Sequence, residues 1–177
     1  MTPALFPSLL GDEWQALDES VRRMHGATPH VRARGEADVG GAANAAARCL
    51  RRVIGLPPPG TRRPLAFAID RTGRRETWQR DFAGRPLRSV LDPARGRLRE
   101  RMGPMTFLFD LRRDGNAIDW QLRRTRLLGI PLPRWMSGAV LSRSGARDGR
   151  YVFEVDVRMP LVGTLVSYRG WLELVDA

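Results

Sequence analysis

The chain has 177 residues, of which 42% are hydrophobic and 28% are charged, a composition typical of one globular domain large enough to bury a core. Its formal net charge is +11, and all 30 basic residues are arginines, which are dispersed along the chain, some as doublets such as Arg22-Arg23, with acidic residues between them. This dispersion favours a basic surface facing water over a specific nucleic-acid footprint, and the lack of a long apolar run predicts no transmembrane segment.

Cysteine usage and the start of the chain indicate the compartment. Cys49 is the only cysteine, so no disulfide can form within the chain and a reducing environment is expected. Residues 1–7 carry neither the basic start nor the apolar run of a signal peptide. We therefore expect a cytoplasmic protein made of a single domain, with a helical part over residues 1–60 and a β part over residues 61–177.

Two amphipathic helices are expected in the N-terminal part. The first is marked by apolar residues at helical spacing that end before Gly26: Leu10, Trp14, Leu17, Val21 and Met24. A short extended run follows at residues 31–35. A second helix, which ends at Gly55, is then marked by Ala42, Ala46, Cys49, Leu50 and Val53. This pattern places the Cys49 thiol on the buried face, where we expect it to be structural and unreactive.

From Pro64 onward the hydrophobic period changes to two, which predicts antiparallel strands joined by tight turns such as Asp148-Gly149. About eight or nine short strands after two helices favour an α+β fold. We expect a strongly curved antiparallel β-sheet or partly closed, calycin-like β-barrel, with the helices over one opening. Its inner face should carry Leu65, Phe67, Trp78, Phe82, Phe107, Phe109, Trp120, Phe153 and Val155.

Two of these strands place a charge where an apolar side chain is expected. Arg80 alternates in phase with Trp78 and Phe82, and Glu100 lies in phase between two apolar residues. These charges either form a buried ion pair that fixes strand register, or line a cavity where Arg80 binds the carboxylate or phosphate of an apolar ligand. The ligand-binding residues predicted by the second interpretation are Trp78, Arg80, Phe82, Glu100, Phe107, Trp120 and Tyr168.

Segment 127–136 is apolar, yet Pro131 and Pro133 stand at alternate positions and forbid a central strand. We expect an edge or a loop there. The segment either folds over the end of the barrel and plugs it, or exposes a portal, a membrane-surface contact or a partner site. The residues that would form such a site are Ile130, Leu132, Trp135 and Met136.

Motifs for catalysis and cofactor binding are lacking in the sequence. The two histidines, His25 and His30, belong to no cluster with metal-ligand spacing, and no phosphate loop or serine nucleophile frame is present. We interpret His25 as a cation at a helix C-terminus. No metal, cofactor or catalytic residue is therefore predicted. An enzyme that uses Glu100 as an acid or base stays a third possibility, against which the nearby charge of Arg80 argues.

Several short stretches carry a resemblance that extends over nearly the whole chain. They are Leu9-Leu10-Gly11, Arg22-Arg23-Met24-His25, Trp78-Gln79-Arg80-Asp81-Phe82, Glu100-Arg101-Met102-Gly103-Pro104, Leu128-Gly129-Ile130-Pro131-Leu132-Pro133, Pro160-Leu161-Val162-Gly163 and Tyr168-Arg169-Gly170-Trp171-Leu172. In these stretches the chain resembles the bacterial family called domain of unknown function 4166. The resemblance implies no assigned activity, and members that occur alone or beside oxidoreductase-like and membrane-protein domains.

Two functions of different classes follow. The first is a non-catalytic binding module for a small apolar or amphipathic acid, with Arg80 as the charged anchor inside a barrel-type cavity. The alternative is an interaction or accessory domain that works with an oxidoreductase or a membrane protein through the apolar segment 129–136. The alternative rests on the family resemblance and on the apolar character of that segment.

Overall fold

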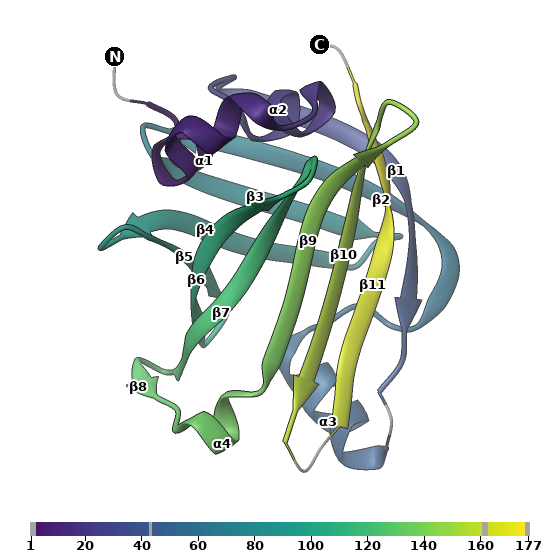
Figure 1. The fold of residues 1–177 in the computed structure, drawn as a ribbon. Coiled ribbons are helices and arrows are strands. Elements are labelled where there is room, and N and C mark those ends of the chain that lie inside the picture. Colours follow the sequence, from purple (N-terminus) through teal and green to yellow (C-terminus); the bar gives the residue numbers. More distant parts are fainter. Residues whose placement is uncertain (1–2, 43, 161–162, 176–177) are drawn as a thin grey trace.

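The computed structural model describes residues 3–42, 44–160 and 163–175, and its main feature is a closed antiparallel β-barrel of ten strands (Figure 1). Strands β1 to β7 pair in chain order, β7 pairs with β9, and β9, β10, β11 and β1 complete the ring. The strands are β1 (His30–Gly40), β2 (Gly60–Thr72), β3 (Arg75–Phe82), β4 (Pro86–Ala94), β5 (Arg97–Met102), β6 (Met105–Asp114), β7 (Ala117–Leu127), β9 (Ala139–Arg147), β10 (Arg150–Met159) and β11 (Gly163–Leu174).

The predicted fold class, a strongly curved or partly closed antiparallel barrel with N-terminal helices, is confirmed. Closure is complete, since β6 and β7 pair from Met105 opposite Leu127 to Asp114 opposite Ala117, and β7 also pairs with β9. A ring of this kind leaves no long unpaired strand edge. The short strand β8 (Ile130–Pro131) lies outside the ring and pairs only with the end of β7.

Inward and outward side chains alternate along the strands, and the inward ones form the core. In β2, Leu65, Phe67 and Ile69 are buried, whereas the intervening alanines and Asp70 are exposed or half-buried. Every residue that the sequence predicted for the inner face lines the interior of the barrel. The period of two was therefore a sound guide to which side chains face inward, because successive strand side chains point to opposite faces.

The N-terminal residues form a cover over one end of the barrel, as α1 (Leu5–Leu10), the 3₁₀ helix η1 (Gly11–Ala16) and α2 (Glu19–His25) (Figure 1). The sequence predicted one helix here. The chain breaks at Gly11, whose φ is 56°, and again before Asp18, which caps α2 by accepting a 2.8 Å hydrogen bond from the Ser20 amide. The apolar residues used for that prediction are nevertheless buried: Leu10, Trp14, Leu17, Val21 and Met24.

The extended run predicted at residues 31–35 is a full barrel strand, β1, which pairs with both β2 and β11. The predicted helical part over residues 1–60 therefore contains one strand of the ring. The second helix, α3 (Ala45–Ile54), lies between β1 and β2 in the chain and at the opposite end of the barrel from α1 and α2 (Figure 1). The prediction that both helices cover the same opening is wrong.

The predicted burial of Cys49 is also wrong, because this residue is exposed. Helix α3 turns a different face inward: Ala47 is fully buried and Arg51 is 8% exposed. These two residues stand four positions apart and so share a face that Cys49 does not. Nη1 of the Arg51 guanidinium is itself buried and has no hydrogen-bond partner among the described residues.

The end of the barrel that carries α3 also carries the short helix α4 (Arg134–Ser137), which follows β8 (Figure 1). Helix α4 contacts β7, and Ser137 is held there by the Thr125 hydroxyl, which donates to the Ser137 carbonyl at 3.3 Å. Across the described ranges of the chain, none of the helices combines the length and the apolar character needed to cross a membrane.

Candidate functional site

The barrel encloses a cavity of about 110 Å³, measured as the space open to the centres of water molecules. Its wall is mainly aromatic and aliphatic, and it extends toward the end that carries α3 and α4, where Leu56, Ser137 and Val140 line it. Such an apolar chamber with a few convergent polar groups is the usual form of a small-molecule site. The predicted ligand-binding residues all line this chamber: Trp78, Arg80, Phe82, Glu100, Phe107, Trp120 and Tyr168.

Arg80 and Glu100 face each other inside this cavity. Nη2 of Arg80 lies 3.6 Å from Oε1 of Glu100, and the two side chains are 10% and 13% exposed. Their strands, β3 and β5, are separated by β4, whose small residue Ser89 accepts a 3.1 Å hydrogen bond from Nη1 of Arg80. The two charges that the sequence placed on the inner face therefore meet across one intervening strand, and the small side chain of Ser89 provides the room for this contact.

The ion pair with Glu100 does not use the full hydrogen-bonding capacity of the Arg80 guanidinium. A separation of 3.6 Å exceeds the roughly 2.7–2.9 Å of a charge-assisted N–H···O bond. The guanidinium carbon also lies 4.9 Å from the ring centre of Trp78 and 5.7 Å from that of Phe67. Both distances are within the range of a cation–π interaction. Arg80 is thus a partly buried cation on an apolar wall that retains donor capacity for an anionic group.

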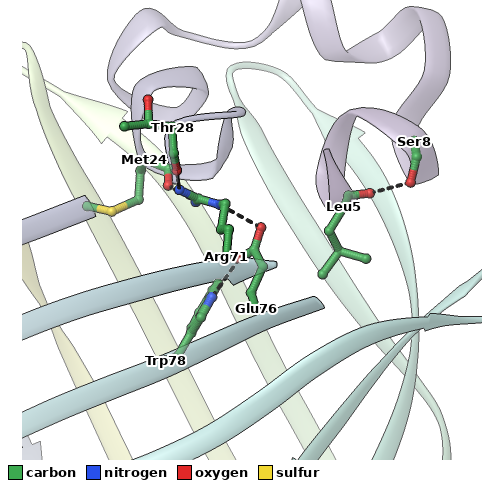
Figure 2. A network of polar contacts seen from close by, with 7 residues as sticks. All are labelled: Leu5, Ser8, Met24, Thr28, Arg71, Glu76 and Trp78. Carbon is green, nitrogen blue, oxygen red and sulfur yellow. Dashed lines mark hydrogen bonds and ion pairs between the residues drawn. The ribbon is translucent and has the colours of Figure 1, made fainter. Parts of the chain in front are cut away.

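A second buried ion pair, which the sequence analysis missed, ties the helical cover to the barrel (Figure 2). Nε of Arg71 lies 2.9 Å from Oε1 of Glu76, and the indole N–H of Trp78 donates to Oε2 at 2.7 Å. The two other guanidinium nitrogens donate to the carbonyls of Met24 and Thr28, each at 2.6 Å. Burial raises the pKa of Glu76, while Arg71 and the indole N–H act in the opposite direction.

A signal for this second pair was present in the sequence. Arg71 continues the inward phase of Phe67 and Ile69, and Glu76 precedes Trp78 in the same phase as Arg80. Both residues stand beside a turn, where strand phase is least certain from sequence. With four polar contacts to protein groups, the Arg71–Glu76 pair is a structural element and not a ligand site.

His25 occupies the centre of the cover. It is fully buried, its Nε2 lies 3.0 Å from the Tyr151 hydroxyl, and its ring lies 4.2 Å from that of Phe6 between ring centres. Burial lowers the pKa of His25 well below its ordinary value, and the charges of Arg71 and Arg80 act in the same direction. The interpretation of His25 as a cation at a helix end is therefore wrong, because the ring is buried and neutral.

Two tyrosine hydroxyls add polar groups to the apolar chamber. Burial is the main cause that raises the pKa of Tyr151 and of Tyr168, and the charge of Arg80 acts in the opposite direction on both. Both rings therefore stay neutral at physiological pH and offer O–H groups. The ring of Tyr168 also contacts that of Phe82 edge-to-face, with 5.6 Å between ring centres.

Trp120 presents the most conspicuous unpaired donor of the cavity wall. The residue is 4% exposed, and its Nε1 has no hydrogen-bond partner among the described residues. An unpaired buried donor costs about 1–3 kcal/mol, and this N–H has almost no accessible surface even toward the cavity, so a ligand acceptor would reach it only if the wall rearranged. The Trp120 ring and the Arg80 guanidinium both lie near the ring of Trp78, with 5.8 Å between the two tryptophan ring centres and 4.9 Å from the guanidinium carbon to the Trp78 ring centre.

The apolar segment does not plug the barrel. Ile130 is 68% exposed, Trp135 is 64% exposed and Met136 is 39% exposed, while Leu132 is half-buried. The expectation of an edge or loop is correct, since the segment consists of the two-residue strand β8 and the short helix α4. Ser137, which follows the exposed pair on α4, lines the cavity. The segment therefore lies beside the cavity and does not fill it.

Candidate metal ligands are scattered over the described ranges, residues 3–42, 44–160 and 163–175. Histidine, cysteine, aspartate and glutamate side chains form no group of three or more there that could hold an ion. His30, which is largely exposed, instead lies 3.0 Å from Asp70 through its Nδ1. The chemistry available in the cavity is that of a cationic and hydroxyl-bearing patch on an aromatic wall.

Comparisons with known proteins place the chain in a family. No curated protein matches it. The family model described as Domain of unknown function (DUF4166) matches residues 17–172, which covers the whole ring of strands described above apart from the last residues of β11. The resemblance drawn from short sequence stretches is confirmed by this match over nearly the full length. The chain therefore belongs to the family of the domain of unknown function DUF4166.

Proposed function

We propose that this protein is a non-catalytic binding module for a small apolar or amphipathic acid. The ligand lies inside the barrel, its apolar part on the aromatic wall and its carboxylate or phosphate at Arg80. The observation that carries the proposal is the loosely paired guanidinium of Arg80, 3.6 Å from Glu100, in a chamber with a mainly apolar wall. Transfer of an apolar chain from water to such a wall is favourable, and the charged donor adds orientation.

Two further features support this proposal and describe the ligand. The hydroxyl of Tyr168, which lines the cavity, provides a neutral donor beside the cation. A chamber of about 110 Å³ for water centres suits a short acyl or aromatic acid better than a long lipid chain. The ligand class is therefore a compact anion with an apolar body.

The first experiment is native mass spectrometry of protein purified from its own cells. A co-purifying small acid supports the proposal, whereas a protein that is empty in every preparation counts against it. The second is calorimetric titration with octanoate and, as a neutral probe of equal chain length, octanol. Octanoate should bind more tightly than octanol, because only octanoate offers a charged acceptor to Arg80.

Variants make this titration specific. Arg80→Met keeps an apolar body of similar length and should weaken octanoate binding on the order of tenfold or more while leaving octanol binding nearly unchanged. Arg88→Met is the matched control, since Arg88 is an exposed residue on β4. Equal octanoate affinity in wild type and Arg80→Met would show that Arg80 is a structural residue only.

An alternative function rests on a different observation, the exposed residues Ile130, Trp135 and Met136. In this alternative the domain is an accessory unit that works with an oxidoreductase or a membrane protein. Ile130→Ser with Trp135→Ser should then abolish co-purification with that partner and leave thermal stability nearly unchanged. For both functions we propose a cytoplasmic location, which the exposed lone thiol of Cys49 supports because such a thiol persists in a reducing compartment.

A further inference from the structure

We propose that one face of this barrel docks on an anionic lipid surface. The face has two adjoining parts. The first, here called the basic face, is a groove on the outside of β5, β6 and β7 lined by Arg95, Arg97, Arg99, Arg101, Arg123, Arg124 and Arg126. The second, here called the apolar tip, consists of the exposed side chains Leu127, Leu128, Ile130, Trp135 and Met136.

The basic face keeps a large excess of positive charge. Asp92 pairs with Arg99 at 2.6 Å and with Arg101 at 2.8 Å. Asp110 pairs with Arg97 at 2.7 Å and with Arg123 at 2.6 Å. Seven arginines thus share two carboxylates, which leaves a formal excess of five positive charges.

Three of these arginines are free for an external anion. Within the described part of the chain, no ion pair joins Arg95, Arg124 or Arg126 to a carboxylate, and the residues that line the groove include no acid. Arg95 and Arg124 are exposed, and Arg126 is half-buried. Their charges are therefore available to bind anions from outside the protein.

Strand register makes the two parts continuous. Arg101 lies opposite Thr106, Thr106 opposite Arg126, and Arg126 opposite Pro131 of β8. The Leu128 amide donates to the Pro104 carbonyl at 2.8 Å, which holds the apolar tip against the turn between β5 and β6. Gly129 lines the same groove as the arginines. An object that contacts the arginines therefore also meets the exposed Leu128 and Ile130.

A lipid surface is the partner that matches both parts. Its anionic headgroups attract clustered arginines, and the layer beneath them accepts apolar side chains, with tryptophan favoured at the boundary. A nucleic acid matches only the charge, because the groove offers no aromatic platform for bases and the apolar tip would remain in water. The proposal therefore commits to a membrane surface that carries anionic phospholipid.

Docking in this orientation brings the α4 end of the cavity to the lipid. Trp135 and Met136 stand on α4, and Ser137 of the same helix and Val140 line the cavity. Figure 1 places β8 and α4 at the end of the barrel opposite the cover formed by α1 and α2. This inference does not depend on the proposed ligand, since the docking face lies outside the barrel.

The test is sedimentation of the full chain with vesicles of pure phosphatidylcholine or of phosphatidylcholine mixed with phosphatidylglycerol. We expect binding to the anionic vesicles that is at least about tenfold tighter than to the neutral ones and that weakens with added salt. Arg124→Gln with Arg126→Gln should reduce it about tenfold. Ile130→Ser with Trp135→Ser should reduce binding to the anionic vesicles by a similar factor. The binding that remains should weaken more steeply with added salt.

Two matched control pairs show whether vesicle binding depends on this face or only on the net charge and the total exposed apolar surface of the protein. Arg32→Gln with Arg34→Gln removes two exposed arginines from β1, and Leu141→Ser with Val175→Ser removes two exposed apolar side chains that lie elsewhere. Both control pairs should bind vesicles as wild type does. Brominated lipids should quench part of the tryptophan emission of the wild type. This quenching should be lost in Trp135→Phe and kept in Trp171→Phe.

Three results would overturn the proposal. The first is equal loss in the control and test pairs, which would reveal unspecific charge attraction. The second is absence of quenching at Trp135. The third is absence of vesicle binding together with capture of a defined protein through the same residues. Arg80→Met should leave vesicle binding unchanged, so a failure of the docking proposal and a failure of the ligand proposal can be told apart.

Discussion

The guanidinium of Arg80 and the carboxylate of Glu100 approach to 3.6 Å although their strands do not pair with each other. The contact crosses β4 above Ser89, which is 1% exposed and accepts a hydrogen bond from Arg80. Two inward charges separated by one strand thereby form a connected polar patch within the apolar chamber.

Arg80→Ala should lower the free energy of unfolding by about 3 kcal/mol, because it leaves the carboxylate of Glu100 largely buried without a cation. Denaturation in urea measures the loss. The double replacement Arg80→Met with Glu100→Leu should recover much of it, since an apolar pair fits the surrounding wall. A double variant no more stable than Arg80→Ala would contradict this account of the pair.

The Arg71–Glu76 pair should matter more for stability than the Arg80–Glu100 pair. Glu76→Ala removes the acceptor of both Arg71 and the Trp78 indole N–H in a fully buried position, and we expect a loss of about 3–5 kcal/mol. Glu76→Gln keeps one acceptor and should lose less. A loss below about 1 kcal/mol for the alanine variant would contradict the role of this pair in holding the cover.

His25 should make stability depend on pH in a defined direction. The pKa of His25 is held well below 6.5 in the folded chain, so below pH 6.5 the unfolded chain binds the proton and the folded chain does not. The free energy of unfolding should therefore fall as pH drops below that value, by up to about 1.4 kcal/mol per pH unit.

The measurement for His25 is urea denaturation at a series of pH values in wild type and in His25→Gln. The contribution of His25 to the slope should disappear in His25→Gln and persist in His30→Gln, whose imidazole is exposed to 75%. Carboxylates contribute equally to the pH dependence of the free energy of unfolding in both variants, so their contribution cancels when the two slopes are compared. An unchanged slope in His25→Gln would contradict the burial of a neutral ring.

Cys49 should react in the native state. Because its side chain is exposed, a thiol reagent such as Ellman's should modify one equivalent without denaturant. Cys49→Ser should change the free energy of unfolding by less than about 0.5 kcal/mol. Labelling that requires unfolding would instead place the thiol on the buried face that the sequence predicted.

Local chemistry explains what could be read from the sequence. Side-chain alternation in a strand follows from covalent geometry, so the inward phase of Arg80 and Glu100 was readable before any partner was known. The turn Asp148-Gly149 and the prolines at 131 and 133 likewise act over a few residues, and both were placed correctly. The ring of strands and the composition of its inner wall follow from this period.

Contacts between distant parts of the chain were decided by the tertiary structure. His25 meets Tyr151 across 126 positions, and this contact makes a helix-end residue a buried neutral ring. The face that α3 turns inward depends on the strand it meets at the rim, so Cys49 became exposed and Arg51 buried. Helical spacing fixes which residues share a face, whereas closure of the barrel fixes which face is covered, because only closure places the partner.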